Sequence, residues 1–582
     1  MAFRGIGQGN ISLADFRSQN LVFVDKTPYV QKFEELKSGA VVFLRPRRFG
    51  KTLFTNILQS YYDKSLASRF DDSFSGTWIH DHRTPLASSF YCLRLDFSLV
   101  PPLPSLIKGG LTGAVNAGLT RFTVSYPDIG LPPDRLNPEL YDSPVSLFLA
   151  FINNFMLRAG PDARLFLIID EYDHFANDVL SSDREAFREL TSTAAGHEGL
   201  IKNFYACIKS FSGNSPWTPI ARVFITGVSA VSLDSVTSGF NIAKNISSDA
   251  RFNDMAGFTH DELSEVVDET VDFSLLNGIT KEQVMGVMER RYDGYLFSRY
   301  ADERIFCPDM CLAFLSDLID TRAIPQNPAG SSSGMDADRL AGMMNLADSE
   351  AREKIGQAIF RKESLTAGMP EALNLNQSGT FNQDQAVSLL TYLGFLTFNP
   401  ESSRKTGMLH WGCPNEVCYQ TFIACEAKSI GFSRSRGLDL TGVSEGGDIM
   451  PLVEETARRI ARLPASAFAG FNERCLQIVF YYTVMDGIDD ALEPELECDT
   501  GSRGRADLFI RNRRIGGRQF LLELKYLSEA KGTGAAVASK LEEAKAQLAR
   551  YRDAPNFKDV KNLDCWAIVF ANKEAKAVEK LA

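Results

Sequence analysis

The segment Val41–Phe54, "VVFLRPRRFGKTLF", decides how the first half of the chain is interpreted. An apolar run ends at Leu44, a short loop follows, and a helical pattern begins at Lys51. The tripeptide Gly50-Lys51-Thr52 ends this loop as a phosphate-binding loop ends: glycine lets the backbone approach phosphate, lysine reaches the β and γ phosphates, and threonine offers its hydroxyl to Mg²⁺. The segment therefore predicts a nucleotide site in which the phosphates lie at a helix N-terminus.

This loop departs from the usual G-x-x-x-x-G-K-[ST] pattern at its start. Arg45 stands in place of the first glycine, and Pro46 lacks an N–H group that could have faced phosphate. A non-glycine residue at positive φ costs about 1–2 kcal/mol, so we expect a reshaped loop. Because charge-assisted hydrogen bonds are roughly twice as strong as neutral ones, we expect Arg45, Arg47 and Arg48 to help bind the nucleotide.

An acidic motif supplies the second half of the predicted site. The stretch "LFLIIDEYD" is an apolar strand pattern that ends in Asp170-Glu171. We expect Asp170 to hold Mg²⁺ and Glu171 to orient the attacking water. Thr226, at the end of the next apolar run, is expected to contact the γ phosphate. Each motif alone also fits an ordinary helix start or polar strand end, but both at successive strand ends predict ATP binding and hydrolysis.

Composition and patterning predict several domains. With 582 residues, 44% hydrophobic and 23% charged, the chain is typical of soluble globular proteins and too long for one core. Apolar runs alternate with helical patterns over 1–270, which predicts an α/β domain with a mainly parallel sheet. We expect a mostly helical domain over 271–440, interrupted by a Gly- and Ser-rich surface loop over 324–336. A polar linker over 433–448 would lead into a second α/β domain over 450–582.

The sequence contains no apolar run long enough for a membrane span and no pattern of a secretory leader. We therefore expect no membrane association and an intracellular protein of the cytoplasm or nucleus.

The C-terminal stretch "GRADLFIRNRRIGGRQFLLELK" carries a second set of candidate residues. Asp507 begins one apolar strand pattern and Glu523 lies in the next, where alternation places Lys525 on the same face. Two carboxylates can hold Mg²⁺, which helps to generate hydroxide from water, and the lysine would steady the developing phosphorane charge. This pattern predicts a metal-dependent nuclease site. A half-buried aspartate beside a surface Glu/Lys pair is the simpler alternative.

Two helices and the local charge extend this prediction. Glu473, on the helix that opens the domain, is expected to add a metal ligand, and Gln547 on a later helix is expected to face the site. From Arg503 onward the chain has 17 Lys and Arg against 10 Asp and Glu, a net +7, within a total of −11 that leaves −18 on the remainder. We therefore expect DNA to bind at the basic C-terminal domain.

Together these motifs resemble a known pairing: an AAA-ATPase-like domain joined to a C-terminal PD-(D/E)XK nuclease-superfamily domain. The resemblance rests on the stretches "FVDKTPYV", "RPRRFGKTL", "IIDEYDHF", "FITGVSAVSLDSVTSGFNIAKNIS", "MAGFTHDEL", "RYDGYLFS", "YLGFLTF", "CPNEV", "GRADL" and "LELK". It implies a P-loop NTPase parallel-sheet domain, a helical, winged-helix-like middle domain and a restriction-endonuclease-like α/β domain. It also implies ATP and Mg²⁺ as cofactors.

Two functions are consistent with these motifs. The first is an ATP-binding and ATP-hydrolysing protein with a metal-dependent nuclease domain that acts on DNA. The alternative is a nucleotide-switched binding or signalling protein whose nuclease-like domain binds DNA or a partner without cleavage. The sequence assigns no arginine finger: Arg251, Arg290 and Arg291 are candidates, and a homo-oligomer in which a neighbour supplies the arginine is left open.

Overall fold

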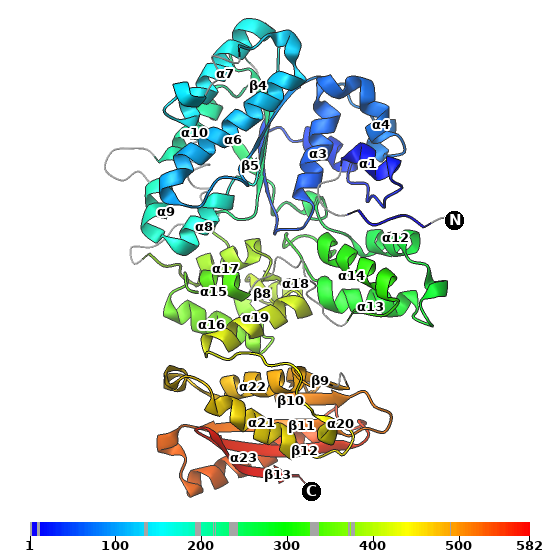
Figure 1. Cartoon of the computed structure of the whole chain (residues 1–582), viewed down its shortest axis with the longest axis vertical. Coiled ribbons are helices and arrows are strands. Elements are labelled where there is room, and N and C mark those ends of the chain that lie inside the picture. Colours follow the sequence, from blue (N-terminus) through cyan, green and yellow to red (C-terminus); the bar gives the residue numbers. More distant parts are fainter. Residues whose placement is uncertain are drawn as a thin grey trace. The chain divides into compact units, whose positions relative to one another are not determined.

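The structure is a computed structural model of the 582-residue chain (Figure 1). By its internal contacts the chain divides into two compact units, unit 1 (Met1–Ile359 and Glu363–Tyr419) and unit 2 (Phe360–Lys362 and Gln420–Ala582). The division into three domains stays a prediction. The structure describes residues 3–7, 12–132, 138–191, 199–213, 215, 217–231, 242–325, 337–370, 373, 379–488 and 491–581. Most of the predicted Gly- and Ser-rich loop, from residue 326, and part of the "FITGV…KNIS" stretch lie outside these residues.

A five-stranded, all-parallel sheet in the order β2-β3-β4-β1-β5 organises the first part of unit 1. The predicted parallel sheet is confirmed. Four apolar runs of the sequence favour strands and are strands: residues 40–44, 90–97, 164–170 and 222–228. The short strand β5 was not predicted. The strands are β1 (Ala40–Leu44), β2 (Tyr91–Asp96), β3 (Leu165–Asp170), β4 (Ile220–Gly227) and β5 (Ala243–Asn245).

Helices cover both faces of this sheet, which explains why the strands read as continuous apolar runs. Figure 1 shows α3 on one side of the sheet and α6, α7 and α10 on the other. Alternate strand residues, such as Val41 and Phe43, pack into the core that contains the apolar face of α3. The bounds are α3 (Lys51–Tyr62), α6 (Pro104–Ser125), α7 (Pro144–Ala159), α8 (His174–Ser182) and α10 (Leu200–Ser210).

The carboxyl ends of the strands meet at one edge of the sheet, where α/β proteins bind ligands. Leu44 at the end of β1 pairs with Gly227 of β4, and Asp96 at the end of β2 pairs with Asp170 of β3. The loop after β1 and the acidic motif after β3 therefore open on the same edge, with β4 between them.

The helical remainder of unit 1 shares its core with the sheet. Val41 and Phe54 belong to the same hydrophobic cluster as Leu263, Val284 and Phe314. The predicted boundary near residue 270 falls at the end of α12, inside this continuous core. The elements are α12 (His260–Thr270), α13 (Lys281–Tyr292), α14 (Pro308–Thr321), α15 (Ala337–Met344), α16 (Ser349–Phe360), α17 (Gln383–Tyr392), α18 (Pro400–Thr406), α19 (Glu416–Ser429), and the antiparallel strands β6 (Leu365–Thr366), β7 (Thr397–Phe398) and β8 (His410–Gly412).

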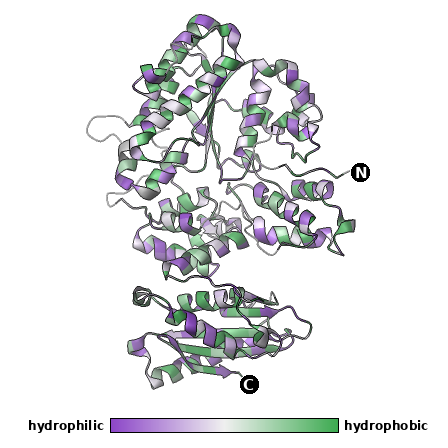
Figure 2. Ribbon diagram, viewed as in Figure 1, coloured by the Kyte–Doolittle hydropathy of each residue, from purple (hydrophilic) through white to green (hydrophobic). Residues whose placement is uncertain are grey.

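Unit 2 contains a second five-stranded sheet, in the order β13-β12-β11-β10-β9, whose three central strands are largely hydrophobic in Figure 2. Strands β10 and β11 pair antiparallel, whereas β11 and β12 pair parallel. The strand-like stretches 505–511, 518–527 and 565–571 and the helical stretch 534–551 of the sequence are confirmed, whereas β9 and β13 were not predicted. The elements are α21 (Met450–Ala461), α22 (Glu473–Met485), β9 (Leu492–Asp499), β10 (Arg505–Asn512), β11 (Gln519–Leu527), α23 (Gly534–Arg552), β12 (Leu563–Ala571) and β13 (Glu574–Lys580).

The polar stretch 433–448, predicted to be a linker, is mostly exposed but is hydrogen-bonded to the end of α22, and its role as a linker stays a prediction. The Arg434 guanidinium donates to the carboxylate of Asp486 at 2.9 Å, and the Ser435 N–H donates to its other oxygen at 3.0 Å. Asp486 is fully buried and also pairs with Arg459. A buried carboxylate needs such partners, and the polar residues of this stretch supply them.

No helix among the described residues is both long and apolar enough to cross a lipid bilayer.

Candidate functional site

The loop between β1 and α3 turns through two residues with positive φ. Gly50, the residue before α3, has a φ of 93°, and Arg48 has a φ of 73°. The left-handed conformation costs a non-glycine residue about 1–2 kcal/mol, so the strain lies at Arg48. Arg45, which stands in place of the first glycine, is not among the described residues with a positive φ.

Arg45 anchors the loop, which corrects its predicted role in nucleotide binding. Its side chain is buried, and its guanidinium donates to the backbone carbonyls of Leu44, Ser247 and Phe252 at 2.7–2.8 Å and of Asn253 at 3.2 Å. The rings of Phe43 and Phe297 lie 4.3 and 4.1 Å from the guanidinium carbon. Burial lowers the pKa of Arg45 to about 9, so it remains a cation at neutral pH. Because both of its terminal nitrogens donate to carbonyls, this guanidinium is not presented to a phosphate.

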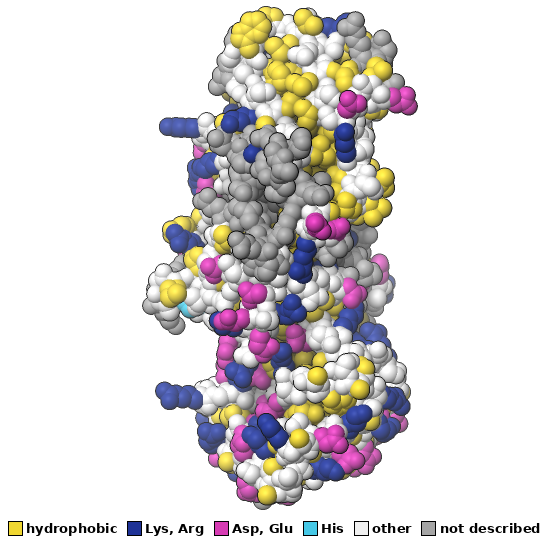
Figure 3. Space-filling view, turned by 90° about the vertical axis from the view of Figure 1, so that its left-hand side faces the viewer, with side chains coloured by type: hydrophobic (Ala, Val, Ile, Leu, Met, Phe, Trp, Pro, Cys, Tyr) yellow, Lys and Arg dark blue, Asp and Glu magenta, His cyan; other side chains and the backbone are white. Residues whose placement is uncertain are grey.

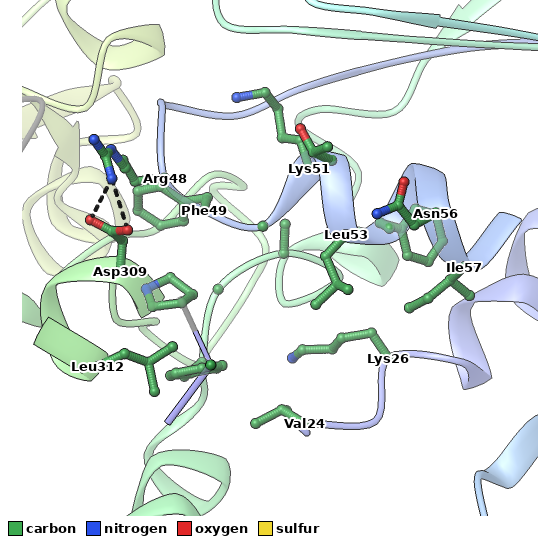
Figure 4. A pocket seen from close by; sticks show the side chains of 18 of the residues that line it. Val24, Lys26, Arg48, Phe49, Lys51, Leu53, Asn56, Ile57, Asp309 and Leu312 are labelled. Atoms are coloured by element: carbon green, nitrogen blue, oxygen red, sulfur yellow. Dashed lines mark hydrogen bonds and ion pairs between the residues drawn. The ribbon is translucent and has the colours of Figure 1, made fainter. Parts of the chain in front are cut away.

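The other two loop arginines also have protein partners. Arg47 contacts Nδ1 of His174 at 3.1 Å. Arg48 donates twice to the carboxylate of Asp309, at 3.0 and 3.2 Å, as the dashed lines in Figure 4 show. Of the three arginines, Arg48 lines the cavity described below. A role in nucleotide binding stays a prediction for Arg47 and Arg48.

Lys51, Asp170 and Glu171 converge at the edge of the sheet. The Lys51 ammonium donates to the carbonyl of Pro46 at 3.1 Å and lies 3.7 Å from a carboxylate oxygen of Glu171. Asp170 accepts from the N–H of Glu171 at 3.1 Å and from the guanidinium of Arg94 at 2.7 Å. Burial raises the pKa of Asp170, and the charge of Arg94 opposes this shift. Glu171 has a φ of 52°, a strained conformation that aims its side chain beside the lysine.

These residues line one end of a cavity of about 640 Å³, within the range of small-molecule sites. Gly50, Lys51, Thr52, Asp170 and Glu171 form its polar end together with Arg94. Apolar side chains also line the cavity, and Figure 4 shows Val24, Leu53, Ile57 and Leu312 among them, with Lys26 beside Val24. Such a cavity can hold a nucleotide with its base against apolar side chains and its phosphates at the N-terminus of α3.

Thr226 does not belong to the described residues that line this cavity. It is fully buried at the end of β4, and its hydroxyl oxygen has no hydrogen-bond partner among the described residues. Contact with the γ phosphate therefore stays a prediction. The three candidate arginine fingers are engaged elsewhere: Arg251 pairs with Asp249, Arg290 with Glu416, and Arg291 donates to the Pro325 carbonyl.

Comparison with known proteins identifies the first region of the chain. Residues 8–237 match the AAA-ATPase-like family, described as a predicted AAA-ATPase. The AAA-ATPase-like part of the resemblance is thereby confirmed for this region, and none of the comparisons shows a C-terminal nuclease domain.

One curated relative and two solved structures are also similar to the chain. An uncharacterised protein from the vnfD 5′ region of Azotobacter chroococcum mcd 1 is 25% identical over 303 residues, which are 50% of this chain and 48% of that protein. The chain thus spans about half the length of this relative. A Walker-type ATPase of Pyrococcus abyssi is 12% identical with a TM-score of 0.37, over 69% of this chain and 96% of that one. The ORC2 protein of Aeropyrum pernix, in ADPNP-ADP complexes, is 11% identical with a TM-score of 0.24, over 69% and 93%.

Apart from the AAA-ATPase-like domain, unit 2 brings a second group of predicted residues together. Leu508 pairs with Leu522, so the antiparallel register sets Asp507 opposite Glu523. The Lys525 ammonium donates to Glu523 at 2.8 Å and to Glu473 at 3.3 Å. Asp507, Glu523 and Lys525 are all buried, with exposed fractions of 7%, 1% and 3%. The half-buried aspartate and surface Glu/Lys pair of the simpler alternative are therefore not what the structure shows.

Burial dominates the electrostatics of these carboxylates. Burial, followed by the charge of Glu523, raises the pKa of Asp507 well above its usual range. Burial also raises the pKa of Glu523 to about 7, and Lys525 opposes the shift. Burial works to lower the pKa of Lys525, but the surrounding carboxylates raise it overall. A cation between the two carboxylates would relieve their repulsion.

Two helices border this group. On α22, the Gln477 amide donates to Asp507 at 2.7 Å, one turn after Glu473. On α23, the negative charges of Glu523 and Asp507 add to burial in raising the pKa of Tyr551, so this side of the helix lies near them. Gln547 lies one turn before Tyr551, and its buried Oε1 has no hydrogen-bond partner in the described part of the chain. A direct role for Gln547 stays a prediction.

The donor set of unit 2 fits a hard cation such as Mg²⁺. Among the described residues no three His, Cys, Asp or Glu side chains converge closely enough to hold a metal ion. Mg²⁺, however, commonly binds through one or two carboxylates together with water and substrate phosphate. Glu523 Oε2 is buried without a hydrogen-bond partner among the described atoms, and Asp507 lies opposite it. In unit 1, Thr52 and Asp170 are the corresponding oxygen donors at the cavity.

Two residues of these sites were missed from the sequence, Arg94 and Gln477. Arg94 interrupts the apolar run of β2, and a lone charge inside a buried strand was a usable signal. Gln477 follows Glu473 by four residues on α22, a spacing that places both on one helix face.

Proposed function

We propose that the chain is an ATP-hydrolysing enzyme whose C-terminal unit is a magnesium-dependent nuclease that acts on DNA. One observation carries the ATPase part: Lys51, Asp170 and Glu171 converge on one cavity at the N-terminus of α3, inside the region that matches the AAA-ATPase-like family.

In this proposal the chain's own groups divide the work. The N–H groups at the start of α3 and the Lys51 ammonium bind the phosphates, for which Lys51 exchanges its contacts with Pro46 and Glu171 for phosphate oxygens. Glu171 is released by the same movement and can orient the attacking water and accept its proton. Thr52 and Asp170 would hold Mg²⁺, which supplies charge neutralisation at the phosphates.

The ATPase is tested by phosphate release from ATP with Mg²⁺. Glu171→Gln keeps the size of the side chain but removes the base, so we expect ATP to bind with unchanged affinity and turnover to fall by about 10²–10⁴. Glu401→Gln, at an exposed position on α18, is the matched control and should hydrolyse ATP at the wild-type rate. Equal turnover in wild type and Glu171→Gln would contradict the assignment.

The nuclease part rests on the two buried carboxylates that face each other across β10 and β11, with Lys525 beside them. Held between Asp507 and Glu523, Mg²⁺ would supply a polarised phosphate and a more acidic water. Lys525 can orient that water or stabilise the charge that develops on phosphorus. The basic residues of the C-terminal sequence supply attraction for DNA, although basic and acidic side chains intermix over unit 2 on the face shown in Figure 3.

Nicking of supercoiled DNA with Mg²⁺ or Mn²⁺ tests this part. We expect the wild type to nick, Asp507→Asn to lose nicking, and Asp553→Asn to retain it because Asp553 is 77% exposed. Nicking by Asp507→Asn at the wild-type rate would reject the nuclease site and leave the ATPase proposal intact.

One observation favours a second candidate, a nucleotide-switched protein that binds DNA or a partner without cleavage. Both oxygens of Asp507 already accept hydrogen bonds, from Gln477 at 2.7 Å and from the Leu524 N–H at 2.6 Å. This carboxylate is therefore well satisfied as a structural group. DNA binding that depends on ATP, without any nicking, would select this candidate.

A further inference from the structure

Arg94 is a cation at the polar end of the cavity, beside Asp170. It lies within β2, next to β3 in the sheet, and its side chain is 18% exposed. Its guanidinium donates to Asp170 at 2.7 Å and to the side-chain oxygen of Asn56 on α3. Arg94 and Asn56 both line the cavity. The guanidinium is thus held between the acidic motif and the helix that follows the phosphate-binding loop.

The contacts of Asp170 require this arrangement to change when nucleotide binds. One carboxylate oxygen accepts from Arg94 and the other from the Glu171 N–H. If Asp170 takes Mg²⁺, that cation and the guanidinium compete for one buried carboxylate, because like charges in a poorly solvated site repel. The phosphates that enter with Mg²⁺ are the nearest new anion, and a guanidinium suits phosphate oxygens because its donors form a planar fork.

We propose that Arg94 contacts the γ phosphate of ATP from within the same chain and stabilises the charge of its transfer. The inference rests on the proposed ATPase and deepens it, since it assigns an arginine that the sequence left open. Other arginines are less suited: Arg48 is held by Asp309 of α14, and Arg251, Arg290 and Arg291 are engaged outside the described lining of the cavity.

Hydrolysis of ATP at this site needs water and Glu171 as the proton acceptor. Water attacks the γ phosphorus, the bond from phosphorus to the bridging β–γ oxygen breaks, and ADP and inorganic phosphate are the products. Glu171 accepts the proton of the water. Negative charge is spread over the γ oxygens and the bridging oxygen during transfer, and an arginine at this place is worth about 10³–10⁵ in turnover in other phosphoryl-transfer enzymes.

Binding measurements separate contact with the γ phosphate from support of Asp170. We would measure dissociation constants of ADP and of a non-hydrolysable ATP analogue for wild type, Arg94→Gln, Arg94→Lys and the control Arg69→Gln, whose side chain is 70% exposed. For Arg94→Gln we expect ADP affinity within about threefold of wild type, which also shows that the variant is folded, and analogue affinity at least about tenfold weaker. Arg94→Lys should fall between, because it keeps the charge but loses the fork.

Single-turnover hydrolysis over a range of Mg²⁺ concentrations completes the test. We expect Arg94→Gln to be at least about 100-fold slower at every Mg²⁺ concentration. Equal loss of ADP and analogue affinity, or recovery of the rate at high Mg²⁺, would overturn the proposal and make Arg94 a positioning residue for Asp170. Absence of hydrolysis by the wild type would instead count against the proposed ATPase, whereas an active wild type with an unaltered Arg94→Gln counts against Arg94 alone.

Discussion

Replacement of Arg45 by methionine tests the anchor of the nucleotide loop. Methionine retains most of the buried volume, but the carbonyls of Leu44, Ser247, Phe252 and Asn253 lose their donors. A buried acceptor left without a partner costs about 1–3 kcal/mol. The variant no longer buries a cation, which is the effect that lowers the pKa of Arg45 to about 9, and this gain offsets part of the cost of the unpaired carbonyls. We therefore expect the free energy of unfolding to fall by about 3–5 kcal/mol.

Thermal unfolding is a direct assay of this loss. A domain of 150–250 residues changes its Tm by about 2–4 °C per kcal/mol, and we therefore expect Arg45→Met to melt roughly 6–20 °C below wild type. Arg45→Lys should recover little, because one ammonium cannot serve four carbonyls. Arg69→Met, at an exposed position, should melt as wild type does. An Arg45→Met variant of wild-type stability that binds ATP poorly would refute this reasoning and restore the phosphate contact first predicted.

Two further predictions concern the pH dependence of unit 2 and the packing of β2. The folded-state pKa of Glu523, about 7, lies above the usual 4.5, so protonation of Glu523 stabilises the fold fully below about pH 4.5, and this contribution is lost as the pH rises through 7. Urea unfolding without Mg²⁺ should show the free energy of unfolding fall by up to about 3 kcal/mol over this range. Glu523→Gln should flatten this pH dependence, and an equally steep dependence in the variant would contradict the assignment. A Cβ at Gly118 of α6 would lie 2.7 Å from the Arg94 carbonyl oxygen and 2.6 Å from Leu95 Cδ2, so Gly118→Ala should destabilise the fold by about 1–3 kcal/mol. A Cβ at Gly113 of the same helix would have no atom within 4 Å, so Gly113→Ala should be neutral or stabilising. Equal melting temperatures of the two variants would count against this packing.

The strands and long helices were predictable because their signals are local. β1, for example, is the apolar run Ala40–Leu44, bounded by a loop with proline and glycine. By contrast, β9 and β13 carry alternating or mostly polar residues at edges of the second sheet, where neighbours rather than propensity decide pairing. The core that joins α3 to α14 involves residues about 260 positions apart, such as Phe54 and Phe314, and no local pattern reveals it.

In the candidate sites too, features set by local sequence were predictable and features set by distant contacts were not. Lys51, Asp170 and Glu171 follow strand ends, so the meeting of those ends at one edge was predictable. The role of Arg45 was not, because three of its four carbonyl partners lie more than 200 residues away in the sequence. An arginine beside a phosphate-binding loop is expected to bind phosphate. Here the buried carbonyls of Ser247, Phe252 and Asn253 need hydrogen-bond donors, and the Arg45 guanidinium supplies them.

In the proposed function, the cavity at the N-terminus of α3 binds ATP through Lys51. Calorimetric titration of ATP with Mg²⁺ into wild type, Lys51→Ala and the exposed-site control Lys37→Ala tests it most directly. The account predicts that wild type and Lys37→Ala bind with the same Kd and that Lys51→Ala binds at least about 30-fold more weakly, as expected when a charged group loses its partner at about 2 kcal/mol or more. A Lys51→Ala variant that binds ATP as tightly as the wild type would contradict it.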